Sequence, residues 1–252
     1  MKIGIFDSGV GGITVLKEAL TQLSGQEYIY YADKLNVPYG TKPKEEVKKY
    51  IFDVVEFLST KNIDALIIAC NTATSIAVKD LRDKYNFPII GMEPAVKPAV
   101  ENSEDKKVIV TATSLTLKEK KFNDLVTRLN SRDIVDSLPL PKLVEYAENF
   151  IFEEDVIISY LRKEFEKFNL DEYGTVVLGC THFPYYKEFF KKVLPNTIDI
   201  IDGNYGTINH LKNLLNIKDR FEDKKKDKIT FYISGKEDNE ILVKYLNLLQ
   251  SK

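Results

Sequence analysis

Two cysteines occupy the positions in this sequence that most directly indicate chemistry. Cys70 follows the apolar run ALIIA (65–69), and Cys180 follows the apolar run TVVLG (175–179). Each is followed by a short polar stretch and then by a segment that we expect to be helical. The thiolate is the reactive form of cysteine, and a helix N-terminus or a neighbouring charge favours it. The matched pair therefore indicates two thiols that take part in acid–base or nucleophilic chemistry.

Three other roles are open to these cysteines. A free cysteine is often only a small buried apolar residue, but two at matched strand ends argue for a shared function. A zinc ion would need further ligands besides Cys180 and His182, and the sequence has no CxxC or HxxH motif. A disulfide between Cys70 and Cys180 is disfavoured in a reducing compartment. We therefore expect neither a metal site nor a disulfide.

A glycine-rich turn, DSGVGG (7–12), follows the first apolar run. Its first glycines match a dinucleotide-binding fingerprint, but Thr14 stands where the third glycine should be, so we expect no nucleotide cofactor. Glycines at a helix start still expose backbone N–H groups that suit an anionic ligand. Asp7 and Ser8 would be delivered to the same place, although Asp7 could instead only cap the turn.

Short apolar runs alternate with longer helix-patterned stretches along the chain. The apolar runs are continuous rather than alternating, as expected for parallel strands that are buried on both faces. Helical segments are expected at 43–60, 72–85, 115–130 and 236–250. This order predicts an α/β fold with parallel sheets. The candidate strands are 2–6, 28–32, 65–69, 88–92, 108–112, 175–179, 198–202 and 229–234.

One design occurs twice in the chain. DALIIACNTATS (64–75) and GTVVLGCTHFPY (174–185) each run from an apolar strand through cysteine into a helix. We infer two similar α/β domains, one formed by 1–92 together with 205–252 and the other by 93–204. Ligands of open α/β sheets bind at the carboxyl ends of strands, so we expect the two cysteines to face each other across a cleft between the domains.

Composition limits the classes of partner. No apolar run approaches the length of about 18 residues that would span a membrane, and no leader pattern precedes the first strand, so we expect a cytoplasmic protein. The net charge of −2 gives no general attraction to nucleic acid. The lysine-rich stretch 218–228 alternates with acidic residues and is interpreted as a solvated connector.

Two thiols on opposite sides of a substrate suit proton transfer at carbon. One would remove a proton from one face and the other would return a proton to the opposite face, which inverts a stereocentre. This requires one thiolate and one thiol, with neighbours that set these states. Asp7 is the natural assistant for Cys70, and His182 is the natural assistant for Cys180.

The motifs closely resemble the glutamate racemase branch of the cofactor-independent Asp/Glu racemase superfamily. The resemblance extends over nearly the whole chain, and FDSGVGG, VPYG and GCTHFP together favour the glutamate branch. Leu140 and Phe183 depart from the residues common in the family. The matching segments are FDSGVGG (6–12), YYAD (30–33), VPYG (37–40), IACNTA (68–73), VIVTATSLT (108–116), PKLVEYAE (141–148), LGCTHFP (178–184) and IIDG (200–203).

The resemblance implies two Rossmann-like, flavodoxin-like domains and a homodimer. It also implies interconversion of L- and D-glutamate without a cofactor, which supplies D-glutamate for peptidoglycan. Cys70 would deprotonate D-glutamate and Cys180 would deprotonate L-glutamate, with Asp7 and His182 assisting. Asp33 and Glu148 match acidic positions around the site. The substrate would be held by Asp7, Ser8, Tyr39, Gly40, Asn71, Thr72, Thr116, Thr181 and His182.

Two alternatives stay open at this point. The first is a racemase of the same superfamily that acts on aspartate or a hydantoin. The second is a non-catalytic amino-acid-binding protein built on paired α/β domains. Such a protein would bind glutamate without exchanging its α-proton.

Overall fold

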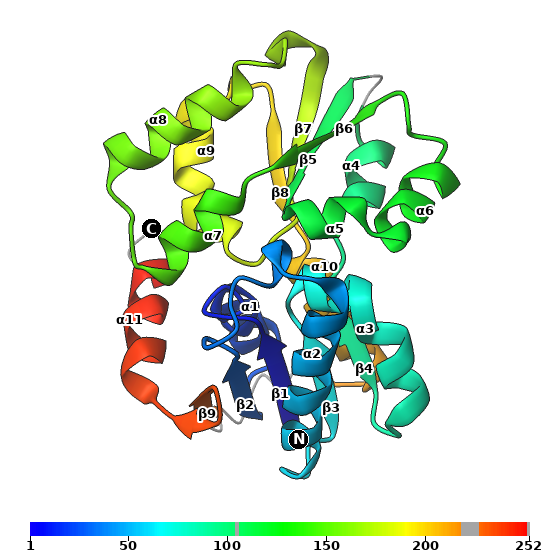
Figure 1. Cartoon of the computed structure of the whole chain (residues 1–252), viewed down its shortest axis with the longest axis vertical. Helices are drawn as coiled ribbons and strands as arrows, with labels where there is room; N and C mark the ends of the chain where they lie inside the picture. The colour runs from blue at the N-terminus through cyan, green and yellow to red at the C-terminus, as the bar shows by residue number, and fades with distance from the viewer. Residues whose placement is uncertain (104–105, 218–226, 251–252) are drawn as a thin grey trace.

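Two β-sheets organise the chain in the computed structural model, which describes residues 1–103, 106–217 and 227–250 (Figure 1). The first sheet has the strand order β10-β9-β2-β1-β3-β4, and the second has the order β6-β5-β7-β8. Neighbouring strands are parallel except for β9 and β10. The strands are β1 (Lys2–Asp7), β2 (Glu27–Ala32), β3 (Ala65–Ile68), β4 (Ile89–Gly91), β5 (Lys107–Ala112), β6 (Val135–Pro139), β7 (Tyr173–Leu178), β8 (Asp199–Asp202), β9 (Lys228–Ile233) and β10 (Lys236–Glu237).

Helices cover the sheets and separate the parallel strands, and short 3-10 helices lie in some of the loops. The α-helices are α1 (Ile13–Gln22), α2 (Lys44–Ser59), α3 (Asn71–Lys84), α4 (Val96–Glu101), α5 (Ser114–Lys118), α6 (Lys120–Arg128), α7 (Pro141–Glu148), α8 (Glu154–Phe165), α9 (Lys187–Val193), α10 (Asn204–Leu214) and α11 (Asn239–Gln250). The 3-10 helices are η1 (Tyr39–Thr41), η2 (Leu170–Glu172) and η3 (Phe183–Tyr186).

Both faces of the first sheet are buried, which explains its continuous apolar strands. Successive side chains of a strand point to opposite faces. Ile3 and Ile5 of β1 accordingly join a core that includes side chains of α1, while Phe6 joins a core with side chains of α2 and α3. Each such buried side chain contributes about 1.5–3 kcal/mol relative to an exposed one. The strands are therefore held between two layers of helices, with their carboxyl ends at one edge.

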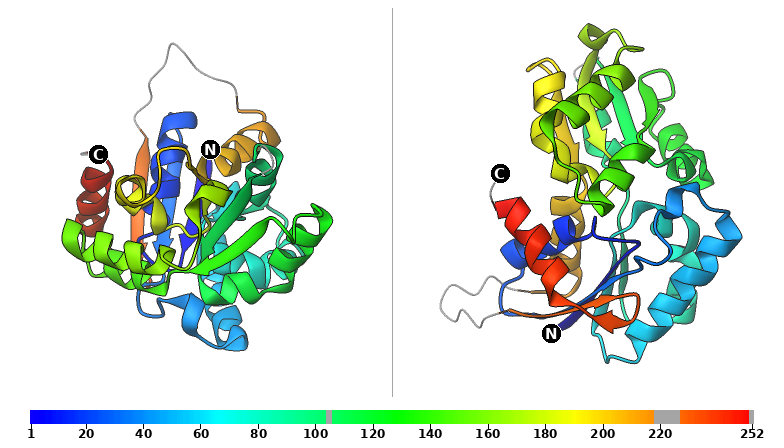
Figure 2. Two further views of the ribbon diagram at one scale, coloured as in Figure 1. Left: turned by 90° about the horizontal axis from the view of Figure 1, so that it is seen from above. Right: turned by 60° about the vertical axis from the view of Figure 1, so that its left-hand side comes forward.

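The second sheet is built in the same way. Val108 and Val110 of β5 face α4 and α6, while Ile109 faces the core that contains side chains of α8 and α9. That larger core also includes side chains of α1, so one hydrophobic cluster continues through both parts of the molecule. After β8 the chain returns to the first sheet through α10, which packs on α1, and through β9, which pairs with β2 (Figure 2).

The α/β fold class with parallel sheets is confirmed, with differences in detail. The helix expected over 115–130 is two helices, α5 and α6, because Glu119 between them is extended and its carboxylate pairs with Lys44 at 2.7 Å. The helix expected from 236 begins at Asn239, because 236–237 form β10. Strand β6 was not predicted; its partly exposed sequence VDSLP lacks a continuous apolar run.

Two expectations of the sequence stay as predictions. The strand pairing is compatible with the division into 1–92 plus 205–252 and 93–204, and we refer below to the parts built on the first and second sheets as the first and second lobes. The connector 218–228 lies, apart from its last two residues, outside the described residues.

Within the described residues, no helix is both long enough and apolar enough to cross a membrane.

Candidate active site

The two cysteines lie at equivalent strand ends and line one small cavity between the lobes. Cys70 comes two residues after β3, which is next to the central strand β1, and Cys180 comes two residues after β7, which is next to β5. The cavity has a volume of about 10 Å³, which is about the room that one water molecule needs. Its lining is Ser8, Pro38, Tyr39, Gly40, Cys70, Asn71, Thr72, Thr113, Val144, Gly179, Cys180, Thr181 and His182.

Cys70 is a buried thiol at the start of α3. Its sulfur accepts a hydrogen bond from the backbone N–H of Ala73 at 3.4 Å and lies 3.6 Å from the hydroxyl of Ser8. Burial, and after it the Asp7 carboxylate, raise the pKa of Cys70 to about 12, although the contacts with Ala73 and Ser8 act in the opposite direction. The sequence indicated that the helix N-terminus would favour the thiolate. Burial outweighs that effect, so Cys70 holds its proton at neutral pH.

Cys180 has a different set of neighbours. Its sulfur lies 3.6 Å from Nδ1 of His182, and Nε2 of the same ring lies 2.7 Å from Oε1 of Glu148. Burial lowers the pKa of His182, but the interactions with Cys180 and Glu148 raise it by more, to well above its usual value. The imidazole is thus held between the Cys180 sulfur and the Glu148 carboxylate, where it can exchange a proton with the sulfur. Cys70 directly precedes the long helix α3, whereas Cys180 is followed by the short 3-10 helix η3. The positive charge beside Cys180 would therefore come from His182 rather than from the N-terminus of a helix.

Asp7 connects the two lobes. Its carboxylate accepts hydrogen bonds from the backbone N–H of Gly9 and from the hydroxyl of Thr181, both at 3.0 Å. The Asp7 side chain is fully buried, and burial raises its pKa despite the opposite effect of His182. On this loop, the Cys70 sulfur has its polar contact with the hydroxyl of Ser8. Asp7 instead acts on Cys70 through its negative charge, which raises the pKa of the thiol.

Replacing Asp7 with asparagine is expected to stabilise the protein at neutral pH. Because the pKa of Asp7 is higher in the folded than in the unfolded chain, its contribution to stability is present below the unfolded value and is lost as the pH rises through the folded value. Asp7→Asn removes this loss, and we expect a gain of about 1 kcal/mol, or about 2–4 °C in melting temperature, at pH 7.

The measurement is thermal unfolding of the wild type and of Asp7→Asn between pH 4 and pH 8. The exposed Asp199 of β8 offers the matched control Asp199→Asn, which should follow the wild type. A gain for Asp7→Asn that shrinks towards pH 4 supports the assignment. A variant that is less stable than the wild type at pH 7 would contradict it.

The glycines of the first loop allow close approach between the lobes. A Cβ atom at Gly9 would lie 1.8 Å from Oε1 of Glu148, and one at Gly11 would lie 2.5 Å from Nδ1 of His182. The hydroxyl of Thr14, which replaces the third glycine of a dinucleotide fingerprint, donates to the carbonyl of Thr181 at 3.0 Å. The loop is therefore shaped to hold side chains of the second lobe rather than a pyrophosphate.

Asp33 supports the cavity from behind. Its buried carboxylate accepts hydrogen bonds from the hydroxyl of Tyr39 at 2.5 Å and from the amide of Asn36 at 3.0 Å. The ring of Tyr39 is thereby fixed with its hydroxyl turned to Asp33. The cavity wall at this point comes from the start of η1, where a Cβ atom on Gly40 would lie 2.4 Å from Thr113.

Three threonine hydroxyls from the two lobes form a closed ring of hydrogen bonds. Thr72 lies 3.0 Å from both Thr113 and Thr116, and the latter two are 2.9 Å apart. Thr113 was not singled out from the sequence, although its place before α5 is typical of an N-cap, and it does accept from the backbone N–H of Thr116. The O–H bonds of these three hydroxyls can rotate to donate hydrogen bonds to an anionic group that enters the cavity.

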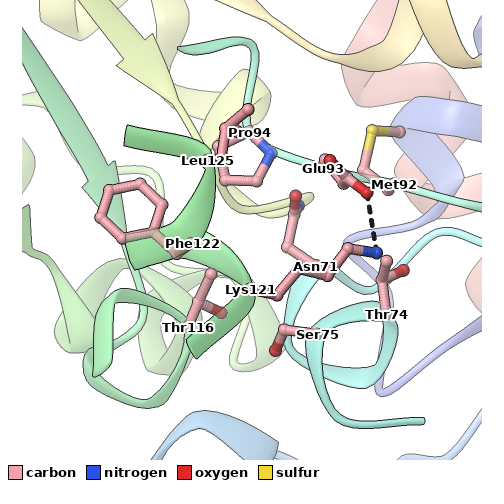
Figure 3. A pocket seen from close by; sticks show the side chains of 10 residues that line it. All are labelled: Asn71, Thr74, Ser75, Met92, Glu93, Pro94, Thr116, Lys121, Phe122 and Leu125. Carbon is pink, nitrogen blue, oxygen red and sulfur yellow. Dashed lines mark ion pairs between the residues drawn. The ribbon is translucent and has the colours of Figure 1, made fainter. Parts of the chain in front are cut away.

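Asn71 separates the cavity from a neighbouring one of about 20 Å³. Figure 3 shows Asn71 in the middle of this second cavity, between residues of α3 and α6, with Glu93 and Lys121 paired at 2.7 Å. The buried Oδ1 of Asn71 has no hydrogen-bond partner among the described residues. Buried polar atoms are normally paired, so this atom is suited to meet a donor on a ligand.

The structure brings together most of the residues that the sequence indicated. Asp7, Asp33 and Glu148 lie one layer behind the cavity wall, and Thr116 borders the neighbouring cavity. Within the described ranges, no three His, Cys, Asp or Glu side chains could together hold a metal ion. The predicted residues that line the cavity itself are Ser8, Tyr39, Gly40, Cys70, Asn71, Thr72, Cys180, Thr181 and His182.

Comparisons with known proteins show the family to which this chain belongs. The sequence profile of the Asp/Glu/hydantoin racemase family matches residues 6–210. A glutamate racemase of Halothermothrix orenii is 62% identical over 252 residues, which cover 99% of each chain. The crystal structure of glutamate racemase from Campylobacter jejuni superimposes with a TM-score of 0.86 at 32% identity, covering 100% of this chain and 98% of that one.

A third similar protein is the Escherichia coli glutamate racemase, whose crystal structure is a complex with L-glutamate. It superimposes with a TM-score of 0.81 at 28% identity, covering 98% of this chain and 94% of that one. The chain belongs to the Asp/Glu/hydantoin racemase family. It is an isomerase of the racemase class, which confirms the resemblance seen in the sequence.

Proposed function

We propose that this protein interconverts L- and D-glutamate by proton transfer between two cysteines, without a cofactor. The observation that carries the proposal is the placement of Cys70 and Cys180 at equivalent strand ends of two sheets, in the wall of one cavity. The high identity to a glutamate racemase over the full chain supports glutamate as the substrate.

The two thiols differ in a way that suits the conversion of L-glutamate. Cys180, beside the imidazole of His182, would take the α-proton as a thiolate, so that an S–H bond forms as the C–H bond breaks. Cys70, which burial keeps as a thiol, would give its proton to the opposite face of the carbanion. The exchange leaves Cys70 as the thiolate, which is the form needed to deprotonate D-glutamate. Asp7 would assist Cys70 through its charge.

Hydrogen-bond donors of the cavity wall would hold the carboxylates of the substrate. Tyr39 and Gly40 would use their backbone N–H groups, because the hydroxyl of Tyr39 is already bonded to Asp33. Oδ1 of Asn71 would meet the substrate ammonium, and the ring of threonine hydroxyls would turn towards a carboxylate. The side chains proposed for this binding are Ser8, Asn71, Thr72, Thr113, Thr116, Thr181 and His182, with Asp7 close to the ammonium.

Substrate entry requires movement. A cavity of about 10 Å³ holds about one water molecule and is too small for an amino acid. The lobes or the loops around Ser8 and Tyr39 would therefore separate to admit glutamate and close again around it. Closure would also exclude water from the carbanion, as proton transfer at carbon requires.

The experiment that tests the function follows the α-proton of L-glutamate and of D-glutamate by NMR in D2O with the wild-type protein. Deuterium incorporation with inversion supports the proposal. A folded protein that does not exchange glutamate would refute it, and aspartate and hydantoins would then be tested. Binding of glutamate without exchange would instead identify an amino-acid-binding protein.

The wider role follows from the same proposal. D-glutamate would be supplied for peptidoglycan, and the cytoplasm is the expected compartment because free thiols must stay reduced to exchange protons. The family resemblance implies a homodimer. Sedimentation of the purified protein would test the homodimer directly.

A further inference from the structure

The last turn of α7 is the part of the second lobe that carries Glu148, and the first lobe holds it at three points. Oε1 of Glu148 accepts from the backbone N–H of Val10 at 2.8 Å. Its carbonyl accepts from Nζ of Lys34 at 3.4 Å. The hydroxyl of Tyr245 in α11 donates to the carbonyl of Ala147 at 2.5 Å.

Tyr245 is a residue that neither the motifs nor the cavity lining singles out. The last carbonyls of a helix lack partners within the helix, so donors from outside it can hold that end. The carbonyl of Ala147 accepts from the backbone N–H of Phe150 at 3.1 Å as well as from Tyr245. Tyr245 is 2% exposed, and burial raises the pKa of its hydroxyl, which therefore remains a donor at all ordinary pH values. Figure 1 shows α11 running from the first lobe towards α7.

The second residue after α7 points to the same contact. Phe150 has a φ of 57°, a left-handed conformation that is uncommon for a bulky residue and that glycine would adopt more easily. Its ring lies edge-on to Tyr245 at 5.2 Å, and Nζ of Lys244 lies 3.7 Å from the ring centre. A ring at this position is useful because it packs against α11.

Tyr245 also contacts the segment that carries Cys180 and His182. Its ring lies 5.6 Å from that of Tyr185, and the Tyr185 hydroxyl donates to the carbonyl of Val10 at 2.8 Å. Tyr245 thus contacts the end of α7 and the η3 segment directly, and Tyr185 extends this contact to the glycine-rich loop.

We propose that Tyr245 is a positioning residue of the reaction, whose hydroxyl holds the end of α7 so that the Glu148 carboxylate stays on the imidazole of His182. This inference rests on the proposed function. Tyr245 touches no reacting atom and acts through Ala147 and Glu148. The charged and titratable groups that face His182 are Glu148, Cys180 and Asp7.

The test compares Tyr245→Phe, which keeps the ring, with the control Tyr232→Phe. Tyr232 lies on β9, and its hydroxyl bonds to Glu237 at the surface, away from α7. The first readout is kcat/KM with each enantiomer of glutamate. We expect Tyr245→Phe to lose about three- to tenfold, the effect of one hydrogen bond, equally for both enantiomers because they are equally stable.

The second readout is the pH titration of the His182 ring, followed by NMR in the full chain. The sequence has two histidines, and His210→Gln identifies the signal of His182. We expect Tyr245→Phe to move this titration to lower pH, because a displaced Glu148 carboxylate stabilises the imidazolium less. Tyr232→Phe should leave both readouts unchanged.

The outcomes separate this inference from the proposed function. An unchanged His182 titration in Tyr245→Phe, or the same shift in Tyr232→Phe, would overturn the positioning role even if stability falls. If the wild type does not racemise glutamate, the proposed function fails. The titration would then still decide whether Tyr245 controls the pair of Glu148 and His182.

Discussion

Changing either cysteine to serine is expected to abolish racemisation of glutamate, with a loss of about a thousandfold or more. A serine hydroxyl is a far weaker acid than a thiol, so it can neither take nor give the α-proton at a useful rate. Cys70 and Cys180 are both buried in the cavity wall, and water has little room to replace them.

The two variants should differ in the reaction that remains. Cys70→Ser keeps the sulfur beside His182, so it should still exchange the α-proton of L-glutamate with D2O, but without inversion. Cys180→Ser should show any residual exchange only with D-glutamate. NMR of each enantiomer in D2O, with thermal unfolding to verify the fold, measures this directly.

Either of two results would contradict the assignment of Cys70 and Cys180 as the acid–base groups. If either serine variant is folded and racemises glutamate within about tenfold of the wild type, that cysteine is not an acid–base group. If both variants exchange the same enantiomer, the two thiols do not face opposite sides of the substrate.

Gly9→Ala is expected to produce the second large effect, although it adds only one methyl group. The new Cβ would lie 1.8 Å from Oε1 of Glu148, an oxygen that is already bonded to Val10 and His182. The carboxylate must move away, and His182 loses the group that holds its ring. We expect a loss of stability of about 1–3 kcal/mol and a fall in kcat/KM of about a hundredfold.

Gly206→Ala provides the matched control. Gly206 is exposed in α10 of the same chain, and a Cβ atom there would have no neighbour within 4 Å. Alanine is the better helix former, so this variant should be at least as stable as the wild type and equally active. Activity assays and unfolding curves of Gly9→Ala and Gly206→Ala measure the expected losses of activity and stability. A fully active Gly9→Ala would show that Glu148 need not lie on this loop.

Much of the fold could be predicted from the sequence because local physical properties encode it. Continuous apolar runs require burial on both faces, and their alternation with helical segments requires parallel strands. The same pattern placed Asp7, Cys70 and Cys180 at strand ends, where ligands of such sheets bind. Strand β6 was missed because its sequence, VDSLP, is only partly buried and lacks such a run.

The sequence by itself therefore determined the α/β class, the strand ends and the residue types that meet there. Only the tertiary structure decided which side chains touch across the lobes, such as Glu148 on His182 and Thr181 on Asp7. These contacts join residues far apart in the chain, and no local propensity specifies them. The tertiary structure also decided that Cys70 is a thiol, because desolvation depends on everything packed around the sulfur and exceeds the effect of the helix end that the sequence revealed.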